Sequence, residues 1–196
     1  MKRIETDLPD VLLFEPKKFG DSRGYFFESF NQRLFDETTG AAVAFVQDNQ
    51  SRSARGVLRG LHYQVEQAQG KLIRVLEGAI HDVAVDIRKD SPTFGRSAAF
   101  LLSAQNNLMA WIPPGFAHGF LALEEGTTVL YKASDFYAPA HERTLLWNDP
   151  ALGLTWPLES VGGRSQVIIS PKDLIGKPLA EAKVYASDPG VRSARA

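Results

Sequence analysis

The chain has 196 residues, 44% of them hydrophobic and 23% charged, which is enough for one well-buried domain. Lys and Arg (22) nearly balance Asp and Glu (23), so no overall field favours a nucleic-acid polymer or an anionic membrane as partner. The absence of cysteine excludes disulfides, thiolate metal sites and a cysteine nucleophile, and the absence of about 18 consecutive apolar residues excludes a membrane span, so we expect a cytoplasmic protein.

Short apolar or alternating segments, cut by Gly, Pro, Asn and Asp, follow one another along the chain and predict many short strands. One helix is predicted from the N-cap Asn31 to Thr39, with Gly40 ending it, and a second is expected near Pro178 to Ala186. The strand segments are GYFFESF (24–30), AFVQDNQ (44–50), RGLHYQ (59–64), KLIRVLEG (71–78), AIHDVAVDI (79–87), AAFLLS (98–103), MAWIPP (109–114), GFLALEEG (119–126) and TTVLYKASDF (127–136). This pattern predicts a mainly β sandwich or barrel with a few short helices.

The composition does not change before the small, polar C-terminal stretch. We therefore predict that residues 1–185 form a single domain and that residues 186–196 are a flexible tail.

His62 lies in a predicted strand, where a lone histidine is most often a hydrogen-bonded structural residue. Its surroundings favour a site: Gly56 before it, and Gly115 and His118 in "PPGFAH" downstream, resemble the two motifs of the cupin superfamily, which are jelly-roll barrels. Metal-binding cupins have a second histidine two residues after the first, and then a glutamate. Here Gln64 replaces that histidine and no glutamate follows at the expected place, so we expect no metal and no other cofactor.

Four further residues on predicted strands carry acid–base chemistry: Lys71, Asp82, His118 and Tyr131. Lys71, Asp82 and Tyr131 each share a strand face with apolar residues, where charged groups need partners. Each also has a structural interpretation, as a lysine that reaches water, a carboxylate that orients a neighbour, or a core tyrosine. Residue by residue, the choice stays open.

A second group is aromatic, polar and basic, and lies in the first third of the chain. Arginine forks bind phosphate oxygens and flat rings stack on bases, so this group could hold a nucleotide diphosphate, although a solvated charged loop is the alternative. No glycine-rich phosphate loop is present, so a nucleotide would be part of the substrate. The group comprises Phe19, Arg23, Phe26, Glu28, Gln47, Asp48, Asn49, Arg52, Arg55 and Arg59.

From about Phe14 to Asp173 the chain resembles the dTDP-4-dehydrorhamnose 3,5-epimerase family. The resemblance rests on "DSRGYFFESF", "FVQDNQSRS", "GVLRGLHYQ", "QGKLIRVLEGAIHDVAVDIRKDSPTFG", "WIPPGFAHGFL", "LYKASDFYAPAHERTLLWNDP", "LGLTWP" and "SPKD", in one order. It implies a metal-independent cupin that acts as a homodimer on a dTDP-deoxyhexose, inverting C3 and C5 of dTDP-4-keto-6-deoxyglucose. A dimer would also protect the apolar segment "VLLFEP", which we expect to be an edge strand.

The resemblance also implies roles for individual residues. His62 would be the general base, Asp173 its orienting carboxylate, Tyr131 the general acid and Lys71 the group that faces the ketone oxygen, with His118 and Asp82 as a supporting pair. Tyr137 would stack on thymine. The remaining implied ligand contacts are Phe19, Arg23, Phe26, Glu28, Gln47, Asp48, Asn49, Arg59, Glu142 and Lys172. The connection before "SPKD" is longer than is usual for the family, so Asp173 and Lys172 depend on how it folds.

Alternatives remain. Related enzymes invert only one carbon or move the ketone along the ring. A non-catalytic sugar-binding cupin would lack the base or the acid, and a metal-dependent cupin oxygenase would hold a stoichiometric metal.

Overall fold

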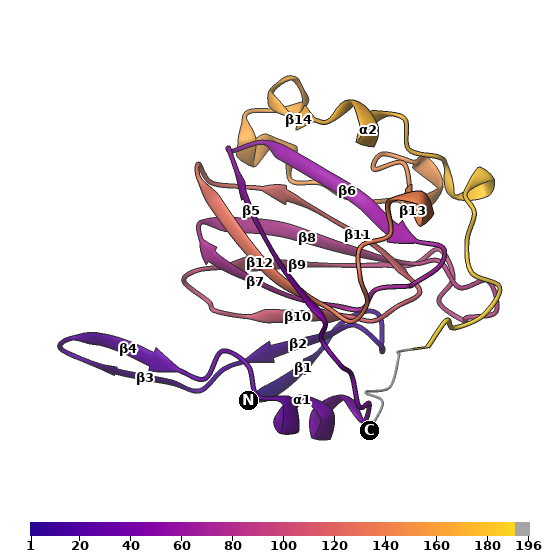
Figure 1. Ribbon diagram of the computed structural model, residues 1–196. Coiled ribbons are helices and arrows are strands. Elements are labelled where there is room, and N and C mark those ends of the chain that lie inside the picture. The colour runs from indigo at the N-terminus through magenta and orange to yellow at the C-terminus, as the bar shows by residue number, and fades with distance from the viewer. Residues whose placement is uncertain (191–196) are drawn as a thin grey trace.

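Two β-sheets face each other in the computed structural model, which describes residues 1–190 (Figure 1). The first sheet has the order β1 (Lys2–Glu5), β2 (Leu12–Glu15), β10 (Met109–Ile112), β7 (Lys71–Glu77), β12 (Thr127–Ala133) and β5 (Gln47–Ser53). The second has the order β13 (Glu142–Thr144), β6 (Val57–Gln64), β11 (Phe116–Ala122), β8 (Ala79–Asp86) and β9 (Ser97–Ser103), and β14 (Ile168–Ile169) pairs with β6 in parallel. The predicted mainly β architecture is confirmed.

The remaining elements lie around these sheets. Helix α1 (Gln32–Thr39) has Asn31 as its N-cap and ends at Gly40 (φ 71°), as predicted. Strands β3 (Lys18–Asp21) and β4 (Gly24–Phe27) form a separate hairpin that projects from the body of the molecule (Figure 1). The C-terminal third contributes α2 (Pro171–Leu174) and the 3-10 turns Pro139–His141, Pro150–Leu152, Leu158–Val161, Arg164–Gln166 and Leu179–Glu181.

Apolar residues of both sheets fill the space between them. Ile73, Val75 and Val129 of the first sheet pack with Ile80 and Ala84 of the second. These residues share strand faces with Lys71, Asp82 and Tyr131. The C-terminal third packs on the outer face of β6, β8 and β11, and α1 packs on the outer face of β2, β7 and β10. The strands that carry His62, His118, Asp82 and Lys71 are thus held on both faces.

Two sequence predictions fail in the structure. Between Pro178 and Ala186 only a 3-10 turn forms, because Tyr185 pairs in extended conformation with Arg88 instead of continuing a helix. The segment "VLLFEP" is not an edge, since β2 lies between β1 and β10. The predicted exposed edge at β2 is therefore wrong, and β2 gives no reason to expect a dimer. Most of the tail predicted for 186–196 lies outside the described residues.

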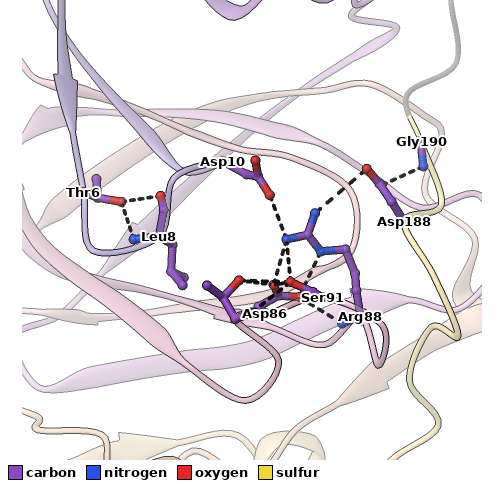
Figure 2. Close-up of polar contacts among 9 residues, drawn as sticks. Thr6, Leu8, Asp10, Asp86, Arg88, Ser91, Asp188 and Gly190 are labelled. Carbon is purple, nitrogen blue, oxygen red and sulfur yellow. Dashed lines mark hydrogen bonds and ion pairs between the residues drawn. The ribbon is translucent and has the colours of Figure 1, made fainter.

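A buried ion-pair network joins three distant segments of the chain (Figure 2). Arg88 donates two hydrogen bonds to the fully buried Asp86 (2.9 and 2.7 Å) and a third to Asp10 in the loop before β2 (2.8 Å). Its guanidinium also lies 3.9 Å from Asp188 near the C-terminus. Burial alone would raise the pKa of Asp86, but hydrogen bonds from Arg88, Ser91 and Thr93 outweigh it and lower this pKa to about 2. The network therefore fastens both ends of the described chain to β8.

Candidate active site

A pocket of about 220 Å³ lies between the two sheets. The first sheet contributes residues of β5, β7 and β12, and the second contributes residues of β6, β11 and β13. The lining residues are Ser51, Arg59, His62, Tyr63, Gln64, Gln69, Lys71, His118, Gly119, Phe120, Val129, Tyr131, Tyr137 and Glu142. Four of the six predicted catalytic residues, from distant parts of the sequence, thus line one cavity.

His62 and Asp173 form a close pair at this pocket. The Nε2 atom of His62 lies 2.6 Å from Asp173 Oδ1, and the second carboxylate oxygen accepts a hydrogen bond from the Gly60 backbone N–H (3.3 Å). Burial alone would raise the pKa of Asp173, but the hydrogen bonds and charge of His62, with those of Gly60 and Ser170, hold it below its usual value. The carboxylate therefore stays ionised against the imidazole.

The long connection before Asp173 is ordered by secondary structure. Residues 158–166 form two 3-10 turns, and β14 then pairs with β6, which delivers the chain to the side of His62. Ser170 caps α2, accepting a hydrogen bond from the Asp173 N–H (3.2 Å). The extra length thus does not displace Asp173.

His118 and Asp82 form a second histidine–carboxylate pair. His118 lies opposite His62 on the neighbouring strand β11, and its Nε2 atom is 3.0 Å from both oxygens of the fully buried Asp82 on β8. Gly60 and Gly119 allow β6 and β11 to approach here, since a Cβ at Gly60 would lie 2.6 Å from the His118 carbonyl oxygen. The two histidines are therefore held side by side.

Lys71 and Tyr131 face the pocket from the first sheet. Burial lowers the pKa of Lys71 to about 8, although the negative charges of Glu142 and Asp82 partly oppose this shift. Burial also raises the pKa of Tyr131, and Glu142 adds to the shift while Arg59 opposes it. At neutral pH the pocket thus holds a cationic lysine and a protonated phenol.

Glu142 links the rim of the pocket to its interior. It accepts hydrogen bonds from Tyr137 Oη (2.7 Å) and from Lys172 Nζ. Burial alone would raise the pKa of Glu142, but these partners and the charge of His62 lower it. Glu142, Lys172 and Tyr137, three of the predicted ligand contacts, therefore form one hydrogen-bonded group.

Of the three neighbouring arginines, only Arg59 lines the pocket. Its Nε donates to Ser53 Oγ (3.1 Å), which fixes the direction of the guanidinium. Arg52 instead pairs with Glu77, and Arg55 binds the Ser160 carbonyl oxygen. The expectation that Arg52 and Arg55 could join a phosphate site in this pocket is not met.

Strand β5 separates its predicted ligand contacts onto two faces. Gln47 and Asn49 share a face with the pocket residue Ser51, and Gln47 Nε2 donates to Asn49 Oδ1 (2.8 Å). Asp48 points the other way and forms an ion pair with Lys132 (3.0 Å). Strand alternation directs the Asp48 side chain away from this pocket, so within one chain the structure does not bring this predicted ligand contact to the site.

The predicted contacts Phe19, Arg23 and Phe26 lie on the projecting β3–β4 hairpin, and Glu28 follows it. None of them lines the pocket. Phe19 and Phe26 are 55% and 72% exposed, and Arg23 pairs with its hairpin neighbour Asp21. Within one chain, the structure does not bring these four residues to the site.

Some pocket residues escaped sequence reasoning. Gln69 and Ser51 line the cavity, and Ser53 orients Arg59. Ser51 and Ser53 alternate with Gln47 and Asn49 on β5, a period-two signal that could have found them.

No group of three or more His, Asp or Glu side chains within residues 1–190 is arranged to hold a metal ion. No helix in the same residues is long and apolar enough to cross a membrane.

Comparisons with known proteins agree with this geometry. Residues 5–181 match the family model of dTDP-4-dehydrorhamnose 3,5-epimerase. The chain is 56% identical over 185 residues to the dTDP-4-dehydrorhamnose 3,5-epimerase of Pseudomonas aeruginosa, covering 94% of this chain and 99% of that one.

Solved structures agree as well. The dTDP-6-deoxy-D-glucose-3,5-epimerase of Legionella pneumophila, in complex with dTDP-4-keto-L-rhamnose, superimposes with a TM-score of 0.88 at 47% identity, covering 93% of this chain and 94% of that one. ChmJ, a 3'-monoepimerase of Streptomyces bikiniensis in complex with dTDP-quinovose, gives a TM-score of 0.82 at 33% identity, covering 90% and 87%. The predicted cupin-type fold is confirmed, and the chain belongs to the dTDP-4-dehydrorhamnose 3,5-epimerase family.

Proposed function

We propose that this protein inverts C3 and C5 of dTDP-4-keto-6-deoxyglucose to give dTDP-4-dehydrorhamnose. The observation that carries the proposal is the placement of a histidine–carboxylate pair on one sheet and a protonated tyrosine on the other, around a single pocket. Inverting a carbon beside a ketone requires a base on one face of the sugar and an acid on the other. Two facing sheets supply such an arrangement.

In this mechanism His62 removes the proton next to the ketone. Asp173 holds the Nε2 side of the ring and stabilises the imidazolium that forms, which leaves Nδ1 to accept the proton. Lys71 donates to the oxygen of the developing enolate, an effect commonly worth about a hundred- to a thousandfold in rate. Tyr131 then delivers a proton to the opposite face. His118 and Asp82 support the pocket beside them.

Substrate binding is assigned to the rim of the pocket. Arg59, whose guanidinium lines the pocket and is oriented by Ser53, suits the diphosphate, and Lys172 adds a second cation. The half-exposed ring of Tyr137 suits stacking on thymine. Glu142, Gln47 and Asn49 complete the polar contacts. The reaction calls for no metal, redox cofactor or covalent intermediate.

The hairpin residues fit this function only if two chains cooperate. Phe19, Arg23 and Phe26 are expected ligand contacts, yet they lie on a projecting, exposed hairpin away from their own pocket. We therefore propose a homodimer in which the hairpin of one protomer reaches the pocket of its partner. Residues 1–185 would then form a single domain, and its active site would be complete only in the dimer.

The test is incubation of the protein with dTDP-4-keto-6-deoxyglucose in deuterated water, followed by NMR. We expect deuterium at both C3 and C5 and a product of inverted configuration at both. Label and inversion at only one carbon would instead identify a single-carbon epimerase. The relative ChmJ, which is named a 3'-monoepimerase, is an example of that class. Movement of the ketone along the ring would identify an isomerase.

A further inference from the structure

Gln64 stands where metal-binding cupins have a histidine, and its side chain forms hydrogen bonds to the backbone. It is 4% exposed at the end of β6, and its amide binds backbone groups of a loop rather than another side chain. We propose that Gln64 is a positioning residue that holds Tyr137 in the orientation needed to receive the nucleobase. The link to nucleobase binding rests on the proposed function; the loop attachment does not.

The hydrogen bonds of Gln64 hold the chain on both sides of Tyr137. Its Nε2 donates to the carbonyl oxygens of Gln67 (2.7 Å) and Phe136 (3.2 Å), and its Oε1 accepts from the N–H of Ala138 (2.8 Å). Phe136 and Ala138 are the neighbours of Tyr137 in sequence. Gln64 therefore fixes the backbone immediately before and after the ring-bearing residue.

Tyr137 needs such support because it lies in a stretch without regular secondary structure. Residues 134–138 follow β12 and precede the 3-10 turn Pro139–His141, and Tyr137 is 51% exposed. Its own N–H donates to Gln47 Oε1 (3.0 Å) and its hydroxyl to Glu142 Oε2 (2.7 Å). Two glutamine amides thus hold three consecutive residues, and the exposed ring gains its orientation from them.

Only an amide can make this set of contacts. It donates two hydrogen bonds from one atom and accepts a third at another. A glutamate of nearly the same shape could still accept from Ala138, but it would donate nothing and would set a carboxylate against two carbonyl oxygens. Buried polar groups left without partners are costly, so the loop would move away rather than keep them.

The expected consequence is weaker binding of the nucleotide. The Gln64 side chain has no hydrogen bond to His62, Lys71 or Tyr131 among the described contacts. Gln64→Glu should therefore weaken the binding of dTDP on the order of tenfold and raise KM by a similar factor. Because Gln64 acts through Tyr137, Gln64→Glu should add little to the loss already caused by Tyr137→Ala.

The experiment combines hydrogen exchange with calorimetry on the full chain. Backbone exchange by mass spectrometry compares the peptide covering 134–140 in wild type, Gln64→Glu and Asn106→Asp. The last is the matched control, because Asn106 is also an amide bonded to backbone groups, in the turn after β9. Calorimetry then measures dTDP binding for wild type, both single variants and the double variant with Tyr137→Ala. If Gln64→Glu does not fold, Gln64→Met, which removes the polar group at similar volume, replaces it.

Faster exchange confined to 134–140, with losses of dTDP affinity that do not add, supports the proposal. Unchanged exchange in this peptide, additive losses, or a fall in kcat at constant KM would overturn it. Failure of the wild type to bind dTDP would instead contradict the proposed function. The exchange data would still decide whether Gln64 holds the loop of residues 134–138.

Discussion

His62 and Tyr131 line the same pocket from opposite sheets, His62 on β6 and Tyr131 on β12. The imidazole is paired with Asp173, whereas the phenol keeps its proton because burial raises its pKa. One group is therefore prepared to take a proton and the other to give one. In the proposed mechanism, a sugar ring bound in the pocket therefore lies between them.

This relationship predicts different outcomes for the two groups. His62→Asn should abolish both solvent exchange and inversion, because it removes the assigned base, the imidazole that Asp173 holds at the pocket. Tyr131→Phe keeps the base, Asp173 and Lys71, so the enolate still forms and the imidazolium can return a deuteron to the face it left. Exchange should then outlast inversion by about ten- to a hundredfold.

Proton NMR in deuterated water reads exchange and inversion in one sample. Exchange that survives in His62→Asn, or inversion at the wild-type rate in Tyr131→Phe, would show that the base or the acid is wrongly assigned.

A second prediction concerns the pH dependence of Lys71. Burial lowers its pKa to about 8 in the ligand-free protein, and only the charged form stabilises the enolate, so kcat/KM should fall as the pH rises through about 8. Glu142 opposes the shift, so Glu142→Gln should lower this pKa further and move the alkaline limb of the profile to lower pH. The measurement is a kcat/KM profile from pH 6 to 10 for wild type and variant. A limb that stays in place in Glu142→Gln would contradict the assignment.

The site residues on the strands came from the resemblance to the family. Residue by residue the roles of His62, Lys71 and Tyr131 stayed open, and the motifs taken together assigned them. The structure brings all three to one pocket, because β6 faces β7 and β12 across it. Asp48 belongs to the same contiguous polar run as Gln47 and Asn49, but strand alternation turns its side chain to the opposite face, where it pairs with Lys132. A polar run in a strand therefore does not form one surface.

Other features depend on contacts between distant segments. The helix expected near Pro178–Ala186 gives way to pairing of Tyr185 with Arg88, which local propensity cannot anticipate. The partners of Arg52 and Arg55 are equally remote in sequence. The position of the β3–β4 hairpin away from its own pocket likewise follows from how the whole chain packs.

A third prediction tests the absence of a metal requirement. Gln64 replaces a metal-ligand histidine and binds the backbone instead, and the proposed mechanism assigns the positive charge near the ketone oxygen to Lys71. Dialysis against EDTA, followed by an assay in metal-free buffer, should leave kcat and KM unchanged. Loss of turnover that one particular divalent ion restores would refute this expectation.

The Asp86–Arg88 pair predicts how stability depends on pH. The pKa of Asp86 is about 2 when folded, below its usual value, so its contribution is present above pH 4 and is lost as the pH falls towards 2. Asp86→Asn leaves the buried guanidinium without its main partner and should lower the free energy of unfolding by roughly 3 to 5 kcal/mol. Urea titrations at pH 7 and pH 3 should show a smaller difference between wild type and variant at pH 3. An equal difference at both would contradict the role given to this carboxylate.

The last prediction decides whether the hairpin serves its own pocket or that of a partner. Arg23→Ala on the hairpin and Lys71→Ala in the pocket should each lower activity strongly. In a mixed dimer, the Arg23→Ala chain supplies an intact Lys71 and the Lys71→Ala chain supplies an intact hairpin. If hairpins cross between protomers, one of the two sites in each mixed dimer is fully wild type. Co-expressing the variants with different tags and purifying the doubly tagged species should therefore restore about half of the wild-type activity per dimer, an expectation that assumes independent sites.

The same preparation contains its own control. If each hairpin served its own chain, every site in the mixed dimer would carry one defect, and activity would stay at the level of the single variants. Sedimentation at micromolar concentration measures the mass of each sample. A monomer mass for the wild type would exclude the dimer, while a dimer without restored activity would keep the assembly and reject the crossing hairpin. Only restoration together with a dimer mass supports a site built from two chains.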